Sequence, residues 1–191
     1  DGRIVFYVAD AAGHGVSAAM LAVLFKHRLA MMDHDYHANG PSVALSAANV
    51  SLMTECAAPG LFVTAAYCLL DTRTRELTVA SAGHPPLVLV RADGRTELIR
   101  HTGPALGLRE AAQFTERCVD LTPGDRLLLY TDGLLDAEDR QVGLTTDHVA
   151  QALVDRNSQG KAVLQALLQM SADRRGGAEQ SDDITMLMLD A

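Results

Sequence analysis

The chain has 191 residues, of which 16 are Lys or Arg and 24 are Asp or Glu, so its formal net charge is −8. An apolar fraction of 48% with 21% charged residues is typical of a packed globular protein and argues against disorder. The acidic balance and the low aromatic fraction of 4% argue against nucleic-acid binding, which needs a basic face and stacking platforms. No segment has the length and hydrophobicity to span a bilayer, and the three cysteines lack metal-ligand spacing, so we expect a cytoplasmic protein without membrane association.

Hydrophobic periodicity and turn residues divide the chain into short strands and two pairs of helices. Segments rich in β-branched, aromatic and other apolar residues predict strands at 3–9, 61–70, 76–82, 87–91, 96–100, 114–121, 126–130 and 184–189. Apolar and amphipathic segments predict helices at 17–32, 43–54, 145–155 and 161–172. Because strands follow one another in runs and helices come in pairs, we expect an α+β fold in which helix pairs cover stacked antiparallel sheets.

Three local patterns carry more specific expectations. Because residues 18–25 are all apolar, the first helix is expected to begin buried on every side. The strands at 114–121 and 126–130 are expected to pair through the turn at Pro123-Gly124-Asp125. The chain opens on Asp1-Gly2, a hairpin-turn dipeptide directly before a strand, so we expect a single domain that is truncated at its N-terminus, with the partner strand upstream.

Acidic residues stand at the ends of three predicted strands. Asp10 follows the first strand, Asp132 follows 126–130, and Asp182 and Asp183 precede the last strand. If these ends meet, the carboxylates repel one another unless a cation lies between them. Oxygen ligands suit Mg²⁺ or Mn²⁺ better than zinc.

Each acidic residue taken singly also has a structural interpretation. Asp132 suits a turn cap, the pair Asp182 and Asp183 suits a solvated surface, and Asp125 and Asp136 suit ordinary turns. The joint occurrence at three strand ends is what favours a metal site.

Two glycine-flanked histidines are open to more than one interpretation. Gly13, His14 and Gly15 precede a helix, where backbone amides bind anions, but the same residues suit a tight turn. His14 is either an acid or base near a metal or a structural hydrogen-bonding residue, and His84 is more consistent with a structural role. A zinc hydrolase using both histidines is a further alternative, but their spacing is not that of a helical metal pair. The absence of a Gly-x-Ser-x-Gly elbow argues against covalent catalysis.

The segment from Asp10 to Ala19, DAAGHGVSAA, resembles the signature DVSGHGxxAA of bacterial PPM-type serine/threonine phosphatases of the SpoIIE/RsbU kind. Asn49 also matches an asparagine that is usual in the second helix. Further matching segments follow in the family's order: FVT at 62–64, AGHPP at 82–86, GPALGL at 103–108, PGD at 123–125, YTDGL at 130–134 and DDIT at 182–185. The resemblance covers nearly the whole chain. The family's upstream Gly-Gly-Asp segment, which carries another acidic residue, is not part of this sequence.

The resemblance implies a four-layer α-β-β-α sandwich, two antiparallel sheets flanked by helix pairs, with a site for two Mn²⁺ or Mg²⁺ ions. Asp10 is then expected to bridge both metals, and the backbone carbonyl of Ala11 to bind one of them. Asp132 and Asp182 are expected to hold the other, so that Asp10, Asp132 and Asp182 form the catalytic set; Asp183 is the poorer ligand of its pair. Water activated by the metals is expected to attack phosphorus, with no protein nucleophile.

The resemblance also implies a function and partners. We expect a metal-dependent protein serine/threonine phosphatase acting on a phosphorylated anti-sigma-factor antagonist or similar phosphoprotein, in a partner-switching pathway. An upstream regulatory domain and a homodimer are expected, with regulation reaching the metal site through the first helix pair. The alternative is an inactive phosphatase-like module that sequesters a regulatory partner.

Overall fold

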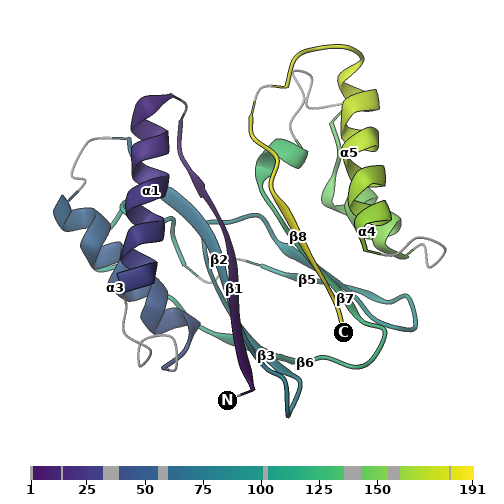
Figure 1. The fold of residues 1–191 in the computed structure, drawn as a ribbon, viewed down its shortest axis with the longest axis horizontal. Helices are drawn as coiled ribbons and strands as arrows, with labels where there is room; N and C mark the ends of the chain where they lie inside the picture. Colours follow the sequence, from purple (N-terminus) through teal and green to yellow (C-terminus); the bar gives the residue numbers. More distant parts are fainter. Residues whose placement is uncertain are drawn as a thin grey trace. The chain divides into compact units, whose positions relative to one another are not determined.

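The computed structural model describes residues 2–13, 15–31, 39–55, 60–100, 103–135, 143–154, 160–180 and 182–191. These residues form two compact units, each with its own sheet, helix pair and apolar core (Figure 1). The first unit comprises Asp1–His84 and His101–Leu121, and the second comprises Pro85–Arg100 and Thr122–Ala191.

The sheet of the first unit is antiparallel and four-stranded. Its spatial order is β1 (Arg3–Ala11), β2 (Val63–Asp71), β3 (Glu76–Ala82) and β6 (Arg117–Asp120). The central strands β2 and β3 are buried at most positions, which explains why their sequences are almost continuously apolar. In the register of β1 with β2, Asp10 lies opposite Thr64 at the end of the pair.

Helices α1 (Val16–Met31) and α3 (Pro41–Glu55) pack on this sheet and share its core. Leu21, Phe25 and Leu29 form the buried stripe of α1. Tyr7 of β1 lies between aromatic neighbours, with its ring edge-on to Phe25 and stacked on Tyr67.

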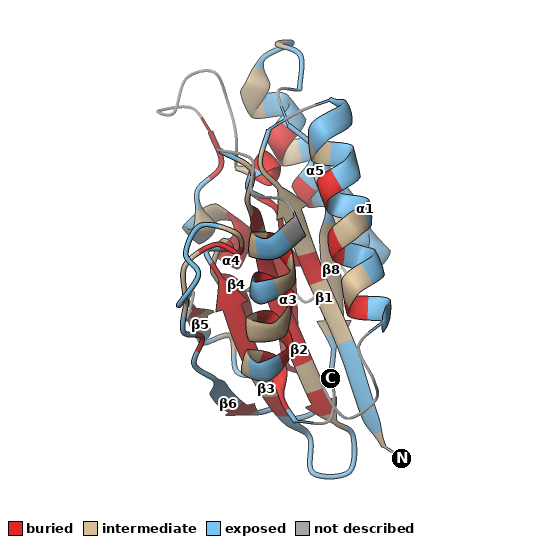
Figure 2. Cartoon of the chain, turned by 90° about the vertical axis from the view of Figure 1, so that its left-hand side faces the viewer, coloured by how far each residue is buried: buried red, intermediate tan, exposed pale blue. Residues whose placement is uncertain are grey.

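The outer face of α1 contradicts the expectation that this helix begins buried on every side. Met20 and Val23 are each 68% exposed, and Figure 2 colours much of the helix as exposed. Only the residues spaced three or four apart toward the sheet are covered. When every residue of a segment is apolar, hydrophobic periodicity carries no information about which face is buried, and this is why the prediction was wrong.

The second unit also consists of a four-stranded antiparallel sheet and a pair of helices. Two helices, α4 (Thr146–Val154) and α5 (Lys161–Arg175), share an apolar core with this unit's sheet. The sheet is antiparallel, in the spatial order β5 (Thr96–Ile99), β4 (Leu87–Val90), β7 (Arg126–Tyr130) and β8 (Met186–Asp190). A short 3-10 helix, η1 (Asp132–Leu134), follows β7, and α5 packs against it. The predicted α+β class, with two antiparallel sheets and two helix pairs, is confirmed.

One predicted strand pair does not form. The segments at 114–121 and 126–130 contain β6 and β7, but β6 pairs with β3 whereas β7 pairs with β4 and β8. The turn between them therefore carries the chain from one sheet to the other. A turn motif predicts a change of direction, whereas the hydrogen-bonding partner of each strand depends on residues far away in the sequence.

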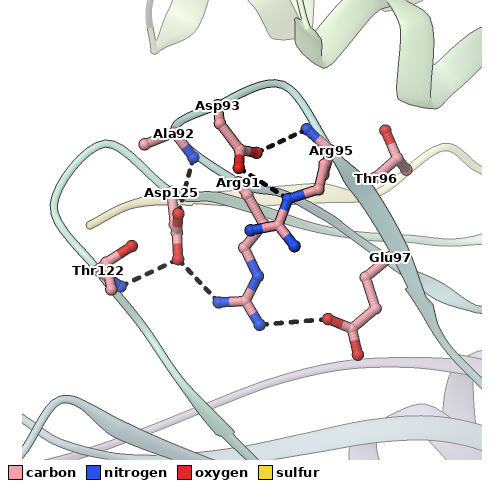
Figure 3. Close-up of a pocket in the computed structure, with 8 residues that line it drawn as sticks. All are labelled: Arg91, Ala92, Asp93, Arg95, Thr96, Glu97, Thr122 and Asp125. Atoms are coloured by element: carbon pink, nitrogen blue, oxygen red, sulfur yellow. Dashed lines mark hydrogen bonds and ion pairs between the residues drawn. The ribbon is translucent and has the colours of Figure 1, made fainter.

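The carboxylate of Asp125 organises this turn (Figure 3). Its side chain is fully buried and accepts hydrogen bonds from the amides of Thr122 and Ala92, both at 2.9 Å. Arg91 donates to it at 3.0 Å and also donates to Glu97 at 3.2 Å. Burial by itself raises the pKa of the Asp125 carboxyl, but these hydrogen bonds hold that pKa below its usual value. Asp125 therefore joins the turn to the β4–β5 hairpin, beyond the local role expected for it.

The cysteines differ in environment. Cys68 is buried in β2, and burial raises the pKa of its thiol, while Cys118 is exposed on β6. Cys56 lies outside the described residues. In the described part of the chain, none of the helices has the length and hydrophobicity needed to cross a membrane.

Candidate metal centre

Asp132 is presented by the turn that follows strand β7. Thr131 is the N-cap of η1, and the amides of Leu134 and Leu135 donate to the carbonyls of Thr131 and Asp132. Leu134 is fully buried in the core of the second unit, whereas the side chain of Asp132 is exposed. The apolar residues thus hold the turn in place while the carboxylate projects into solvent.

Asp182 lies in the loop that leads into β8. Its Oδ1 atom accepts a hydrogen bond of 2.8 Å from the amide of Asp183, and Gln180 donates to its carbonyl at 2.8 Å. The first contact orients the Asp182 carboxylate, and the second holds the backbone of Asp182. One of its oxygen atoms lies within 4.8 Å of one oxygen of Asp132, and both side chains are exposed. The structure therefore brings together two of the predicted ligands, both within the second unit.

This pair of carboxylates has the chemistry of a site for a hard cation. Two ionised carboxylates this close repel each other, and a cation between them removes the repulsion. Both ligands offer only oxygen, which suits Mg²⁺ or Mn²⁺. Asp183, the poorer candidate, is exposed beside them, and its backbone amide is the group that orients Asp182.

In the first unit, Asp10 lies at the end of β1 and is partly buried. Ala11 is the last residue of the strand, and the amide of Ala12 donates to the Phe62 carbonyl at 2.8 Å. The chain then passes through Gly13 and Gly15, both with positive φ, before α1 begins. His14 lies outside the described residues, as does Asp136, so their roles remain predictions.

The second histidine singled out from the sequence is buried. His84 is 2% exposed, and its Nδ1 atom lies 3.0 Å from the Thr64 hydroxyl. Gly83 before it has a φ of +63°, and a Cβ there would lie 2.9 Å from the amide nitrogen of Ala105. These contacts agree with a structural role for His84. Within the described ranges, the group of residues that could hold a metal ion contains no histidine or cysteine. The zinc alternative also needs His14, which lies outside these ranges, so it stays an alternative.

The family model of stage II sporulation protein E (SpoIIE) matches residues 1–191, the whole chain. The chain belongs to the SpoIIE family. Its sequence is 26% identical over 212 residues to protein IcfG of Synechocystis sp., covering 98% of this chain and 33% of IcfG. It is 25% identical over 202 residues to phosphoserine phosphatase RsbP of Bacillus subtilis, covering 98% of this chain and 46% of RsbP. The chain thus spans less than half the length of these curated relatives.

Solved structures with the same fold include phosphatase domains. The SiaA-PP2C domain of Pseudomonas aeruginosa has a TM-score of 0.82 at 22% identity, covering 100% of this chain and 80% of that chain. The catalytic domain of the serine threonine protein phosphatase PstP, solved with 2 manganese ions, has a TM-score of 0.69 at 18% identity, covering 98% of this chain and 89% of that one. The predicted family is confirmed.

Two residues of this SpoIIE-family chain have contacts that the sequence did not predict. Asn49 of α3 is buried, donates to the Arg109 carbonyl at 2.9 Å and accepts from the Gly107 amide at 2.9 Å. It therefore ties α3 to the loop before β6. Thr131 contacts the loop that carries Asp182. Asn49 matches an asparagine that is usual in the family, and Thr131 stands in a segment that matches it; this resemblance was the only available signal.

Proposed function

We propose that this chain is a metal-dependent phosphatase that removes phosphate from phosphoserine or phosphothreonine in a protein. The observation that carries the proposal is the pair of exposed carboxylates, Asp132 and Asp182, which lie after the end of β7 and before the start of β8 and have oxygen atoms within 4.8 Å of each other. Membership of the SpoIIE family supports the same activity, as does the name of the relative RsbP, a phosphoserine phosphatase. The whole chain is proposed to act as one phosphatase domain.

The donor atoms fit Mn²⁺ or Mg²⁺, because they are carboxylate oxygens accessible to solvent. We propose that Asp132 and Asp182 hold one ion, that Asp10 bridges this ion and a second one, and that the carbonyl of Ala11 binds one of the two. The presence of 2 manganese ions in the solved PstP structure supports this count. When bound, the cations neutralise phosphoryl oxygens and lower the pKa of the attacking water.

The residues of the chain bind and orient rather than attack. The hydroxyl adjoining Asp132 in the sequence belongs to Thr131, which is 2% exposed and already makes two hydrogen bonds. It is therefore not available as a nucleophile. The Asp183 amide fixes the orientation of Asp182 by bonding one of its oxygens.

The proposed substrate is a phosphorylated anti-sigma-factor antagonist or a similar phosphoprotein within a partner-switching pathway. We further propose that a regulatory domain and homodimerisation control the site through α1. Gly13 and Gly15 connect the end of β1, which carries Asp10, directly to this helix. The relatives IcfG and RsbP extend well beyond the matched region, which supports a separate regulatory part.

The test is hydrolysis of a phosphoserine peptide with Mn²⁺ by the full chain and by the variants Asp132→Asn and Asp182→Asn. We expect each variant to lose about 100-fold or more in turnover, because a metal ligand is weakened. Asp173→Asn, on the exposed face of α5, is the matched control and should retain full turnover, and Asp183→Asn should lose less than about threefold.

Two results would contradict the proposal. Equal turnover of the wild type and Asp132→Asn would exclude a metal site at these carboxylates. A wild-type chain that binds a phosphoprotein without hydrolysing it, at any Mn²⁺ concentration, would favour the sequestering module instead.

A further inference from the structure

Thr131 makes three contacts with the loop that carries Asp182. Its hydroxyl donates to the Asp183 carbonyl at 3.0 Å and accepts from the Thr185 amide at 2.9 Å. Its own amide donates to the Thr185 carbonyl at 3.0 Å. We call these three hydrogen bonds, between Thr131 and residues Asp183 and Thr185, the Thr131 bridge.

The bridge lies where the β7–β8 ladder ends. The last residue pair of the ladder is Tyr130 with Met186. The Thr131 bridge joins the residues that adjoin this pair, Thr131 and Thr185. A hydroxyl can donate and accept at once, so the Thr131 hydroxyl bonds both a carbonyl and an amide in the segment just before β8. No cap hydrogen bond comes from this side chain to η1, although Thr131 is the N-cap residue. Its hydroxyl is therefore committed to the Asp182 loop.

Gly133, on the C-terminal side of Asp132, also lies against the backbone of the loop that carries Asp182. A Cβ at this position would lie 2.5 Å from the carbonyl oxygen of Asp183 and 3.1 Å from that of Asp182. Only a residue without a side chain permits this approach of the two backbones. Asp132 thus stands between two residues that both contact the backbone of the Asp182 loop.

We propose that Thr131 is a positioning residue that, together with Gly133, sets the spacing of the Asp132 and Asp182 carboxylates for a divalent cation. This inference rests on the proposed function. The two carboxylates repel each other before a cation arrives, so the backbone segments that carry them must be held together by other contacts. The Thr131 bridge supplies those contacts, and the Thr131 side chain that makes two of them is buried. Groups that orient metal ligands change metal affinity even though they never touch the metal.

The first test measures Mn²⁺ affinity of the full chain by titration calorimetry and by the loss of the electron paramagnetic resonance signal of free Mn²⁺. Thr131→Val keeps the shape of the side chain but removes the hydroxyl, and we expect it to weaken Mn²⁺ binding about tenfold. Thr131→Ser restores the hydroxyl and should bind Mn²⁺ within about twofold of the wild type. At saturating Mn²⁺, turnover of Thr131→Val should largely recover, because the ligands themselves are intact.

Ser171→Ala is the matched control. Ser171 is also a buried hydroxyl of the second unit, but its hydrogen-bond partner is Arg175 on the same helix. We expect this variant to bind Mn²⁺ as the wild type does. Should Thr131→Val fail to fold, Thr131→Ala and Thr131→Ser give the same comparison through the loss and retention of the hydroxyl.

A second test needs no metal. In the metal-free chain, the Thr185 amide should exchange with deuterium about ten times faster in Thr131→Val than in the wild type, while the Leu128 amide in the middle of β7 stays protected.

The outcomes separate the two hypotheses. If the wild type binds Mn²⁺ and hydrolyses phosphopeptide but Thr131→Val binds Mn²⁺ equally well, the positioning role is wrong and the proposed function stands. Equal loss of affinity in Thr131→Ser and Thr131→Val would also overturn it. If the wild type binds no Mn²⁺, the proposed function fails, and this inference fails with it.

Discussion

The two strand ends that carry the acidic residues are built in different ways. After β7, Asp132 is flanked by Thr131 and Gly133, both of which contact the loop of Asp182. After β1, Asp10 is followed by a turn in which a Cβ on Gly13 or Gly15 would meet no atom of the described residues within 4 Å, apart from its chain neighbours. One strand end is closely packed and the other is open. The first therefore suits a fixed ligand geometry, and the proposed regulation of Asp10 through α1 would act at the second.

The sharpest test of this contrast compares Gly133→Ala with Gly13→Ala. At Gly133 the new methyl group meets the Asp183 backbone at 2.5 Å, so we expect a loss of about 3 kcal/mol in the free energy of unfolding. At Gly13 the space is open and only the φ of +91° is unfavourable, which costs about 1 kcal/mol. Urea denaturation of both variants measures the difference. Equal losses would show that the two turns are equally constrained.

Acid should weaken the second unit through Asp125. The pKa of its carboxyl is lower in the folded chain than in the unfolded chain, so its stabilising effect is present above the ordinary carboxyl pKa of about 4. It is lost as the pH falls through the lowered folded value. Unfolding free energies measured between about pH 6 and pH 3 should therefore fall less steeply in Asp125→Asn than in the wild type. Asp173→Asn, on an exposed helix face, should keep the wild-type slope, and a parallel slope for Asp125→Asn would contradict the assignment.

The smallest effect on stability is expected on the outer face of α1. Met20→Ser changes a side chain that is 68% exposed, so the free energy of unfolding should change by less than about 0.5 kcal/mol. Phe25→Ala, in the buried stripe of the same helix, should cost about 3–5 kcal/mol. If α1 transmits regulation, Met20→Ser should alter dimerisation or activation while thermal unfolding stays unchanged. Normal activation and dimerisation in Met20→Ser would remove the support for regulation through this face.

The sequence predicted the elements well because their local patterns are strong. The strands at 76–82 and 126–130 begin and end in the structure where turn residues and apolar segments placed them. Which strands pair with each other was harder to predict from the sequence. Strands β6 and β7 are neighbours in sequence yet belong to different sheets. The environment of Asp125 was also missed, because its burial depends on Arg91 and Ala92, which are contributed by another turn.

For the candidate site, the sequence alone determined which residues are acidic and that each stands at the end of an apolar strand. That much follows from local composition, because a charged residue interrupts an apolar run. Only the tertiary structure decided that Asp132 and Asp182 lie close together and that Thr131 spans 52 and 54 residues to reach Asp183 and Thr185. Hydrogen bonds between segments so far apart leave no periodic pattern in either one, since their geometry exists only once the sheet has formed.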